Sequence, residues 1–310
     1  MKAFFRRHAK TVAAPVVPKR VAGNVIAHKI VVPQKQYPKC KRALVIGITY
    51  TGTPHALTGC INDANRMKEY LTNRCDFATD NVRLLTDHPN ADAMLLPTRE
   101  NIIQGIQWLV GGLPKKNTQL VFYYSGHGTQ QPVEEGSDSE SDGMDETLCP
   151  LDFPTSGFIV DDELKRIMVD PLPSYAKLFA LFDCCHSGTM LDLRYECRVS
   201  NNYASNASNA SNAKVPAFYF KQNLCDSISQ ANVIALGGCM DSQVSADTYL
   251  GHTNQGALTW AFFEIIGKSV NVSYKSLLIG VCSLLRKRKY QQVPQLSSGH
   301  FVDLKSYFRL

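Results

Sequence analysis

Two stretches of the chain decide its fold: Tyr-Tyr-Ser-Gly-His-Gly at 123–128 and Asp-Cys-Cys-His-Ser-Gly at 183–188. Each one closes a run of apolar, β-prone residues, at 119–124 and at 176–182. Open α/β sheets present ligand-binding and reactive groups outside the carboxyl ends of their parallel strands. The sequence therefore predicts two strands that end at the same edge, one offering a histidine and the other a thiol.

Strands and helices alternate along the rest of the core. Strands are expected at 43–49, 82–86, near 147–151, at 232–236 and after residue 295, and helices at 62–71, 98–110, near 161–169, at 256–266 and around 277–285. This rhythm predicts an α/β fold with a mostly parallel central sheet that helices cover on both faces.

Two segments do not fit the core pattern. Residues 1–40 hold four prolines and no sustained helical period, which predicts a flexible basic arm. Residues 198–214 are rich in Asn, Ser and Ala and cannot bury a core, so they predict a flexible loop. We expect one domain at 41–310, which this loop divides into a larger portion (about 41–197) and a smaller one (about 215–310).

Charge and cysteine content limit the class of partner and compartment. Residues 1–62 contain eleven Lys or Arg and no acid, whereas the whole chain is only +6. No basic patch is interleaved with aromatic residues, so no specific nucleic-acid partner is expected. Ten cysteines without a Cys-x-x-Cys pair indicate a reduced, cytoplasmic protein. The Arg-rich start leaves a mitochondrial location as the alternative. No apolar run reaches the roughly 20 residues of a membrane span.

Strand alternation distinguishes the two neighbouring cysteines. Residues two apart share a face, so Ser125 and His127 should point one way, as should Asp183 and Cys185, while Cys184 should point into the core. We therefore predict Cys185 as a nucleophile and His127 as its proton relay, an arrangement typical of Cys–His hydrolases. The amides of Gly128 and Cys185 are expected to form an oxyanion hole.

The two motifs resemble the catalytic signatures of the metacaspases, caspase-related cysteine peptidases. The likeness rests on Tyr-Ser-Gly-His-Gly-Thr-Gln at 124–130 and Asp-Cys-Cys-His-Ser-Gly-Thr at 183–189, supported by Ala-Leu-Val-Ile-Gly-Ile at 43–48 and Ser-Ala-Asp at 245–247. The short first portion resembles the trypanosomatid type I members. The resemblance implies a caspase-like fold, a His127–Cys185 dyad, cleavage after Arg or Lys, and a monomer.

The resemblance also implies a pocket for a basic side chain, formed by Cys60, Asp63, Ser125 and Asp183. Two carboxylates in a partly dry pocket attract a guanidinium or ammonium group and repel a substrate aspartate. Without the resemblance, Asp63 would be interpreted as an acid in the first turn of a helix.

An acidic run at 134–146 suggests a cation site. An EF-hand is excluded because its twelfth position would be Cys149 in place of a bidentate Glu. Metacaspases are typically activated by calcium, and the resemblance implies Asp142, Asp161, Asp162 and Asp192 as ligands. We therefore expect Ca²⁺ as an activating cofactor.

The function that follows is a calcium-dependent cysteine endopeptidase that cleaves protein or peptide substrates after Arg or Lys and processes itself. Lys19, Arg20, Lys29, Lys35, Lys39, Arg198 and Lys214 are the candidate self-cleavage sites. One alternative is a calcium-responsive scaffold or protein-quality-control factor with incidental peptidase activity. A legumain-like peptidase is disfavoured because no secretory signal opens the chain and the pocket candidates are acidic.

Overall fold

The computed structural model describes residues 40–114, 117–133, 143–200, 217–223, 228–238, 247–250, 253–269 and 271–310. Met1–Gln36 and Tyr37–Leu310 form separate units, and only the second contains described residues. The predicted arm at 1–40 therefore lies outside the described residues except for Cys40, which opens the first strand.

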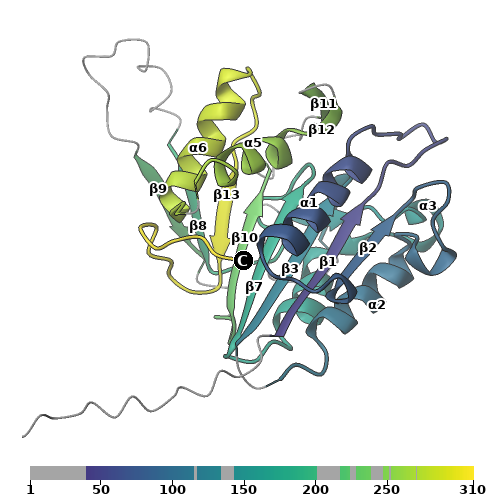
Figure 1. Cartoon of the computed structure of the whole chain (residues 1–310), viewed down its shortest axis with the longest axis horizontal. Helices are drawn as coiled ribbons and strands as arrows, with labels where there is room; N and C mark the ends of the chain where they lie inside the picture. Colours follow the sequence, from purple (N-terminus) through teal and green to yellow (C-terminus); the bar gives the residue numbers. More distant parts are fainter. Residues whose placement is uncertain are drawn as a thin grey trace, which may run out of the picture. The chain divides into compact units, whose positions relative to one another are not determined.

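An eight-stranded sheet forms the centre of the second unit, with the strand order β2-β1-β3-β7-β10-β13-β8-β9 (Figure 1). Its strands are β1 Cys40–Gly47, β2 Val82–Thr86, β3 Thr118–Ser125, β7 Ala176–Asp183, β8 Tyr195–Val199, β9 Phe218–Gln222, β10 Asn232–Gly237 and β13 Gln295–Ser298. The first five strands in this order pair in parallel, and β13, β8 and β9 continue the sheet with antiparallel pairs. This confirms the predicted α/β class with a mostly parallel sheet.

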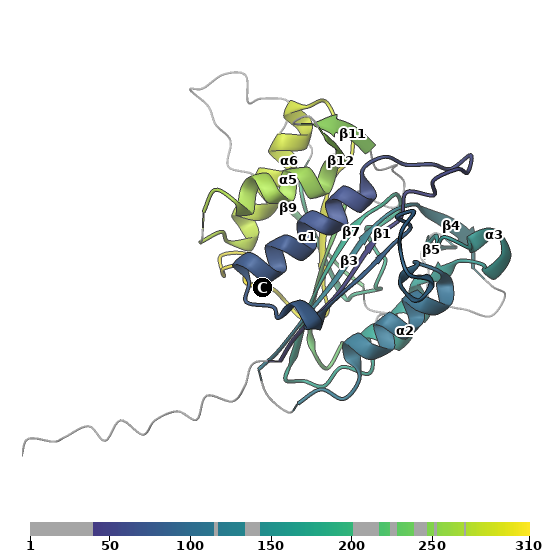
Figure 2. The same cartoon turned by 45° about the vertical axis from the view of Figure 1, so that its right-hand side comes forward.

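Helices cover both faces of the sheet. In Figure 2, α2 lies on one side of the sheet, and α1, α5 and α6 lie on the other. The helices are α1 Cys60–Arg74, α2 Arg99–Val110, α3 Phe153–Ser156, α4 Asp161–Leu164 with a π-helical turn Lys165–Val169, α5 Ala257–Ile266 and α6 Tyr274–Lys287. Along β3, Val121 and Tyr123 pack under α1, α5 and α6, whereas Phe122 and Tyr124 pack under α2 and α4. Since both faces are buried, the central strands are apolar at almost every position.

The boundaries of the helices follow local chemistry. α2 begins after Thr98 because its hydroxyl accepts a hydrogen bond from the backbone N–H of Asn101 at 3.3 Å, and it ends at Gly111. Ser273 caps α6 in the same way through Ser276 N–H. The predicted helices at 62–71 and 256–266 are found with ends shifted by a few residues, as α1 and α5.

The predicted strand near 147–151 is wrong in position and partnership. The strand is β5, Met144–Leu148, and it lies in a separate antiparallel sheet with β4 Gly128–Pro132 and β6 Ile159–Val160. β4 was not predicted, because its polar residues carry no strand pattern and it becomes a strand only through its pairing with β5.

Other strands were missed for related reasons. β8 extends through Val199, two residues into the segment predicted as a loop, while residues 201–214 of that loop lie outside the described residues. β9 and the hairpin β11 Asp247–Leu250 with β12 Thr253–Gly256 were also not predicted. In the described part of the chain, no helix has both the length and the apolar character needed to cross a membrane.

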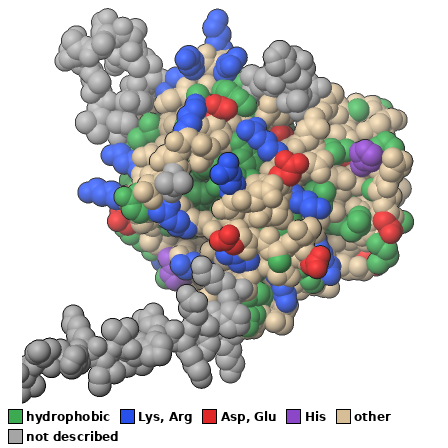
Figure 3. Space-filling view, in the orientation of Figure 1, with side chains coloured by type: hydrophobic (Ala, Val, Ile, Leu, Met, Phe, Trp, Pro, Cys, Tyr) green, Lys and Arg blue, Asp and Glu red, His purple; other side chains and the backbone are tan. Residues whose placement is uncertain are grey.

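The basic side chains are unevenly distributed on the surface in Figure 3, where Lys and Arg gather around the end of α6. The last turn of α6 and the residues after it supply Arg286, Lys287, Arg288 and Lys289. The described acids of the predicted specificity pocket and calcium site are, by contrast, mostly buried inside the fold.

Candidate active site

The two motifs leave the sheet side by side. β3 and β7 are parallel neighbours, and Ser125 lies directly opposite Asp183 in their register. Cys184 packs in the apolar core with Phe182 and Tyr124, whereas Cys185 is partly exposed. This is the division that strand alternation predicts, and it leaves Cys185 as the accessible thiol of the pair.

The turn after Cys185 is held in an unusual backbone conformation. His186 has a φ of +50°, in the left-handed region that non-glycine residues seldom adopt. The hydroxyl of Ser187 stabilises the turn because it donates to the carbonyl of Cys184 at 3.0 Å and accepts from Gly238 N–H at 2.9 Å. The surrounding hydrogen bonds thus fix a strained turn that lifts residue 185 out of the sheet.

The imidazole of His127 is oriented by a backbone carbonyl. Its Nε2 lies 2.7 Å from the carbonyl oxygen of His55. A carbonyl can only accept, so Nε2 carries the proton in this contact and Nδ1 is the nitrogen able to take a proton. The ring of Tyr50 lies 4.8 Å away between centroids, and the Tyr50 hydroxyl accepts from His127 N–H at 3.1 Å. Tyr50 and His55 were not among the predicted site residues. The His55 acceptor is a backbone carbonyl, which carries no residue-type signal, and the Tyr50 contacts join segments distant in sequence.

The backbone of Gly128 packs closely against Cys184 and Cys185. A Cβ at position 128 would lie 2.3 Å from the carbonyl oxygen of Cys185 and 3.1 Å from the Sγ of Cys184. Glycine is therefore required for β4 to approach the end of β7. The residue after the histidine and the predicted nucleophile are in direct contact.

We expect Gly128→Ala to separate these two segments and to lower kcat by about 100-fold, because displacements near 1 Å are sufficient for such losses. Steady-state kinetics on a peptide substrate checks this, with circular dichroism to verify the fold. Gly112→Ala provides a control for glycine loss, since nothing lies within 4 Å of a Cβ there. Because Gly112 has a φ of +60°, Gly112→Ala should lower stability, but it should not change kcat. Full activity in Gly128→Ala would contradict the close approach.

A second thiol, that of Cys149, lies near Cys185. Cys149 is buried, and its N–H donates to the carbonyl of His127 at 3.2 Å. Burial, followed by the nearby Cys185, raises the pKa of the Cys149 thiol to about 12. Because a thiol is nucleophilic only as the thiolate, Cys149 does not compete with Cys185 at neutral pH.

The predicted specificity acids meet at the start of α5. Asp63 is 1% exposed and accepts from Gly256 N–H at 2.6 Å, while Asp183 is 5% exposed and accepts from Thr259 N–H at 2.8 Å. A Cβ on Gly256 would lie 2.1 Å from Asp183 Oδ2. Asp63 and Asp183 also both raise the pKa of the buried Tyr123, after the larger effect of burial itself. The two carboxylates therefore share one buried region, where the first turn of α5 stabilises their charge.

The other two predicted pocket residues lie on the adjoining elements. Ser125 is buried at the end of β3, directly opposite Asp183, and Cys60 is buried at the first position of α1, three residues before Asp63. The structure thus brings Cys60, Asp63, Ser125 and Asp183 to neighbouring positions of α1, β3 and β7.

The predicted calcium ligands are brought together only in part. Asp161 is fully buried, and its carboxylate accepts from the N–H groups of Glu146 at 2.7 Å and Asp162 at 2.8 Å. Burial, then the charge of Asp192, raises the pKa of Asp161 to about 10. The Asp162 side chain is exposed, and Asp142 lies outside the described residues. Glu146 of β5 is a further buried acid of this cluster, because its charge also raises the pKa of Asp161. Glu146 and the buried Asp145 beside it in the chain were predicted only as part of an acidic loop.

The acidic cluster fits a hard cation by its chemistry. Its donors are carboxylate oxygens, the class that Ca²⁺ prefers, and their mutual repulsion in a buried region favours a bound positive charge. Within the described residues, no three His, Cys, Asp or Glu side chains are grouped closely enough to form a metal site. The described residues therefore supply carboxylates of the right chemistry, but they do not form a complete set of metal ligands.

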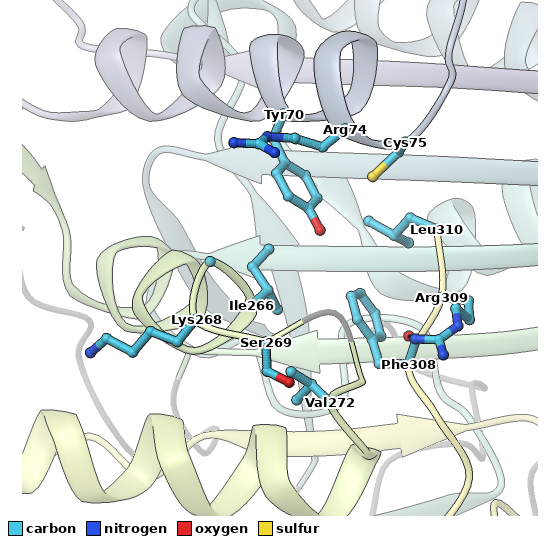
Figure 4. Close-up of a pocket in the computed structure, with 11 residues that line it drawn as sticks. Tyr70, Arg74, Cys75, Ile266, Lys268, Ser269, Val272, Phe308, Arg309 and Leu310 are labelled. Atoms are coloured by element: carbon cyan, nitrogen blue, oxygen red, sulfur yellow. The ribbon is translucent and has the colours of Figure 1, made fainter.

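A pocket of about 720 Å³ lies at the opposite ends of α1 and α5 from Asp63 and Gly256 (Figure 4). It is lined by Tyr70, Arg74, Cys75, Ile266, Gly267, Lys268, Ser269, Val272, Phe308, Arg309 and Leu310. Two of its cations already have partners, because Lys268 pairs with Glu264 at 3.0 Å and Arg309 donates to Asn271 at 2.7 Å. The pocket is separate from the His127–Cys185 region.

A parallel sheet that presents a thiol and an oriented imidazole at one edge defines a thiol hydrolase of the α/β class. A family model described as metacaspase, peptidase C14 domain, matches residues 41–194. The chain is 39% identical to Metacaspase-1 of Yarrowia lipolytica over 311 residues, covering 88% of this chain and 65% of that protein. It is 36% identical to Metacaspase-1 of Scheffersomyces stipitis, covering 88% of this chain and 75% of that protein.

The chain belongs to the metacaspase family, which places it among the cysteine-type endopeptidases. A solved structure of a protein from Geobacter sulfurreducens is 26% identical and superposes with a TM-score of 0.58 over 88% of this chain and 98% of that one. The family predicted from the two motifs is thus confirmed. The closer likeness to trypanosomatid members stays a prediction.

Proposed function

We propose that the chain is a calcium-activated endopeptidase that cleaves protein or peptide substrates after Arg or Lys, with Cys185 as nucleophile and His127 as proton relay. The observation that carries the proposal is the pairing of β3 with β7, which puts Ser125 opposite Asp183 and the two motifs at one edge. The buried acids at the start of α5 support the basic preference.

The proposed mechanism begins with proton transfer from the Cys185 thiol to Nδ1 of His127, whose Nε2 is held by the His55 carbonyl. The thiolate attacks the scissile carbonyl carbon and forms a tetrahedral intermediate, which the amides of Gly128 and Cys185 stabilise. His127 then protonates the departing amine, leaving a thioester. Water, deprotonated by His127, hydrolyses the thioester and regenerates the thiol.

Specificity in this proposal comes from charge placed in a dry region. Asp63 and Asp183 are buried, so an Arg or Lys side chain that reaches them exchanges water for charge-assisted hydrogen bonds. An aspartate in the same position would be repelled by both carboxylates. Cys60 and Ser125 complete the wall of the proposed pocket.

Calcium would be held by Asp161 and Asp192, with Asp142 and Asp162 as further oxygen donors. The ion would supply positive charge to a cluster of buried carboxylates. Asp192 itself has a φ of +42° and its N–H donates to the carbonyl of Thr189 at 2.7 Å, four residues after Cys185. The loop that shapes the nucleophile is thus anchored in the proposed cation site.

Chelation of calcium is expected to lower kcat/KM on an Arg-terminated fluorogenic peptide by about 10-fold or more, with recovery when calcium is restored; couplings of this kind are usually 5- to 150-fold. Asp161→Asn should shift the calcium dependence to higher concentrations. Magnesium serves as the control, because its strict octahedral geometry suits this ligand set poorly. Equal activity in chelator and in calcium would show that calcium does not activate the enzyme, and the proposed peptidase mechanism would still stand.

Self-processing after a basic residue is part of the proposal, and of its candidate sites Arg198 lies in β8, whereas Lys19, Arg20, Lys29, Lys35, Lys39 and Lys214 lie outside the described residues. The alternative, a calcium-responsive scaffold with incidental peptidase activity, predicts a cellular function that survives Cys185→Ala. Complementation with that variant distinguishes the two.

A further inference from the structure

The carboxylate of Glu146 joins the two segments that carry the proposed dyad. Its Oε1 accepts from Gln130 Nε2 at 2.8 Å, and its Oε2 accepts from the Thr189 hydroxyl at 2.6 Å. Gln130 lies three residues after His127 on β4, and Thr189 lies four residues after Cys185. One side chain therefore bridges the strand after the histidine and the loop after the nucleophile.

The bridge is buried and geometrically fixed. Glu146 is 1% exposed, and it sits directly opposite Gln130 in the antiparallel pairing of β4 with β5. A buried carboxylate that loses a donor carries a large desolvation penalty, so both contacts should persist in the folded state.

Other contacts hold the same loop from the opposite side. Ser187 accepts from Gly238 N–H at the end of β10, and the carbonyl of Gly188 accepts from the side chain of Gln295 on β13 at 3.1 Å. In the sheet order these strands lie beyond β7, away from β3 and the β4 strand that follows it. Of these three tethers, only the one to Glu146 connects the loop to the histidine side.

We propose that Glu146 is a positioning residue that clamps the Cys185 loop to β4, the strand that follows His127, and so sets the thiol–imidazole geometry. The inference rests on the proposed Cys185–His127 chemistry and does not depend on the preference for Arg or Lys. The carboxylate of Glu146 bonds Gln130 and Thr189, so the effect of Glu146 on the chemistry passes through the two segments that it joins.

Thr189→Val tests the clamp with the least disturbance, since it removes the hydroxyl donor and leaves every acid in place. We expect kcat to fall about 10-fold with KM changed less than about 3-fold, because small losses of alignment reduce the chemical step. Thr189→Ser should restore the rate. Assays at saturating calcium separate this effect from a change in cation affinity.

Alkylation of Cys185 by iodoacetamide, followed at that residue by mass spectrometry, gives a second measurement that needs no substrate. The alkylation rate should fall across the pH range in Thr189→Val and Glu146→Gln, because the imidazole of His127 is less well aligned with the Cys185 thiol in these variants than in the wild type. Glu196→Gln is the matched control. Glu196 is also a buried glutamate that accepts from a side-chain amide, Asn223 at 2.6 Å, but it lies on β8.

A double-mutant cycle makes the test specific to the bridge. Because Glu146→Ala already removes the partner of Thr189, adding Thr189→Val should lower kcat little further. The Asp161 contact uses the backbone N–H of Glu146 and survives the side-chain change.

Independent, additive losses would overturn the clamp, as would an unchanged kcat and alkylation rate in Thr189→Val, or a lowered melting temperature alone. If the wild type fails to cleave basic peptides, the proposed function fails. The alkylation rates still decide whether the clamp exists.

Discussion

Cys185→Ala is expected to lower kcat by about 10⁴-fold or more, because the variant lacks the proposed nucleophile, the partly exposed thiol that follows β7. Activity is measured on an Arg-terminated fluorogenic peptide in calcium. The residual rate reflects binding and electrostatic stabilisation without a covalent step.

The neighbouring cysteine supplies the matched control. Cys184 is buried among Phe182 and Tyr124, so Cys184→Ala removes one buried sulfur and should reduce stability modestly while leaving kcat within about 10-fold. A thermal melt measures the first effect and kinetics the second. The assignment is wrong if Cys184→Ala is inactive and Cys185→Ala retains activity.

Asp183→Asn is expected to lower kcat/KM for Arg substrates by about 100-fold or more, since removing one partner of a buried charge pair costs roughly 2–5 kcal/mol. The same peptide with citrulline in place of Arg keeps the shape and loses the charge. Its kcat/KM should change little, so that discrimination between the two peptides collapses in the variant.

Structural damage is separated from lost specificity by two checks. Asp183 also accepts from Thr259 N–H in the first turn of α5, so the melting temperature of the variant must be measured. Asp92→Asn removes a carboxylate that caps a short helical turn through Met94 N–H, and it should leave the discrimination intact. An equal decrease in kcat/KM for the Arg and citrulline peptides would show that Asp183 supports the fold and does not distinguish charged from neutral substrates.

Much of the fold could be predicted from local patterns. Apolar runs at 119–124 and 176–182 indicated β3 and β7, and helical periodicity indicated α1, α2 and α6. The small sheet of β4, β5 and β6 could not be predicted, because Gly128–Pro132 is polar and becomes a strand only through its partner. The acids Asp145 and Glu146 were assigned to a loop for the same reason.

The sequence by itself determined which residues end the central strands and, through alternation, that Cys184 faces the core while Cys185 does not. Those conclusions depend on the period of a strand, which is a local property of the chain. Only the tertiary structure decided what surrounds each motif. The His55 carbonyl at Nε2 of His127, the α5 amides on Asp63 and Asp183, and the Glu146 bridge all join segments distant in sequence. Such contacts arise from packing between elements and from backbone atoms, which leave no pattern in the order of the residues.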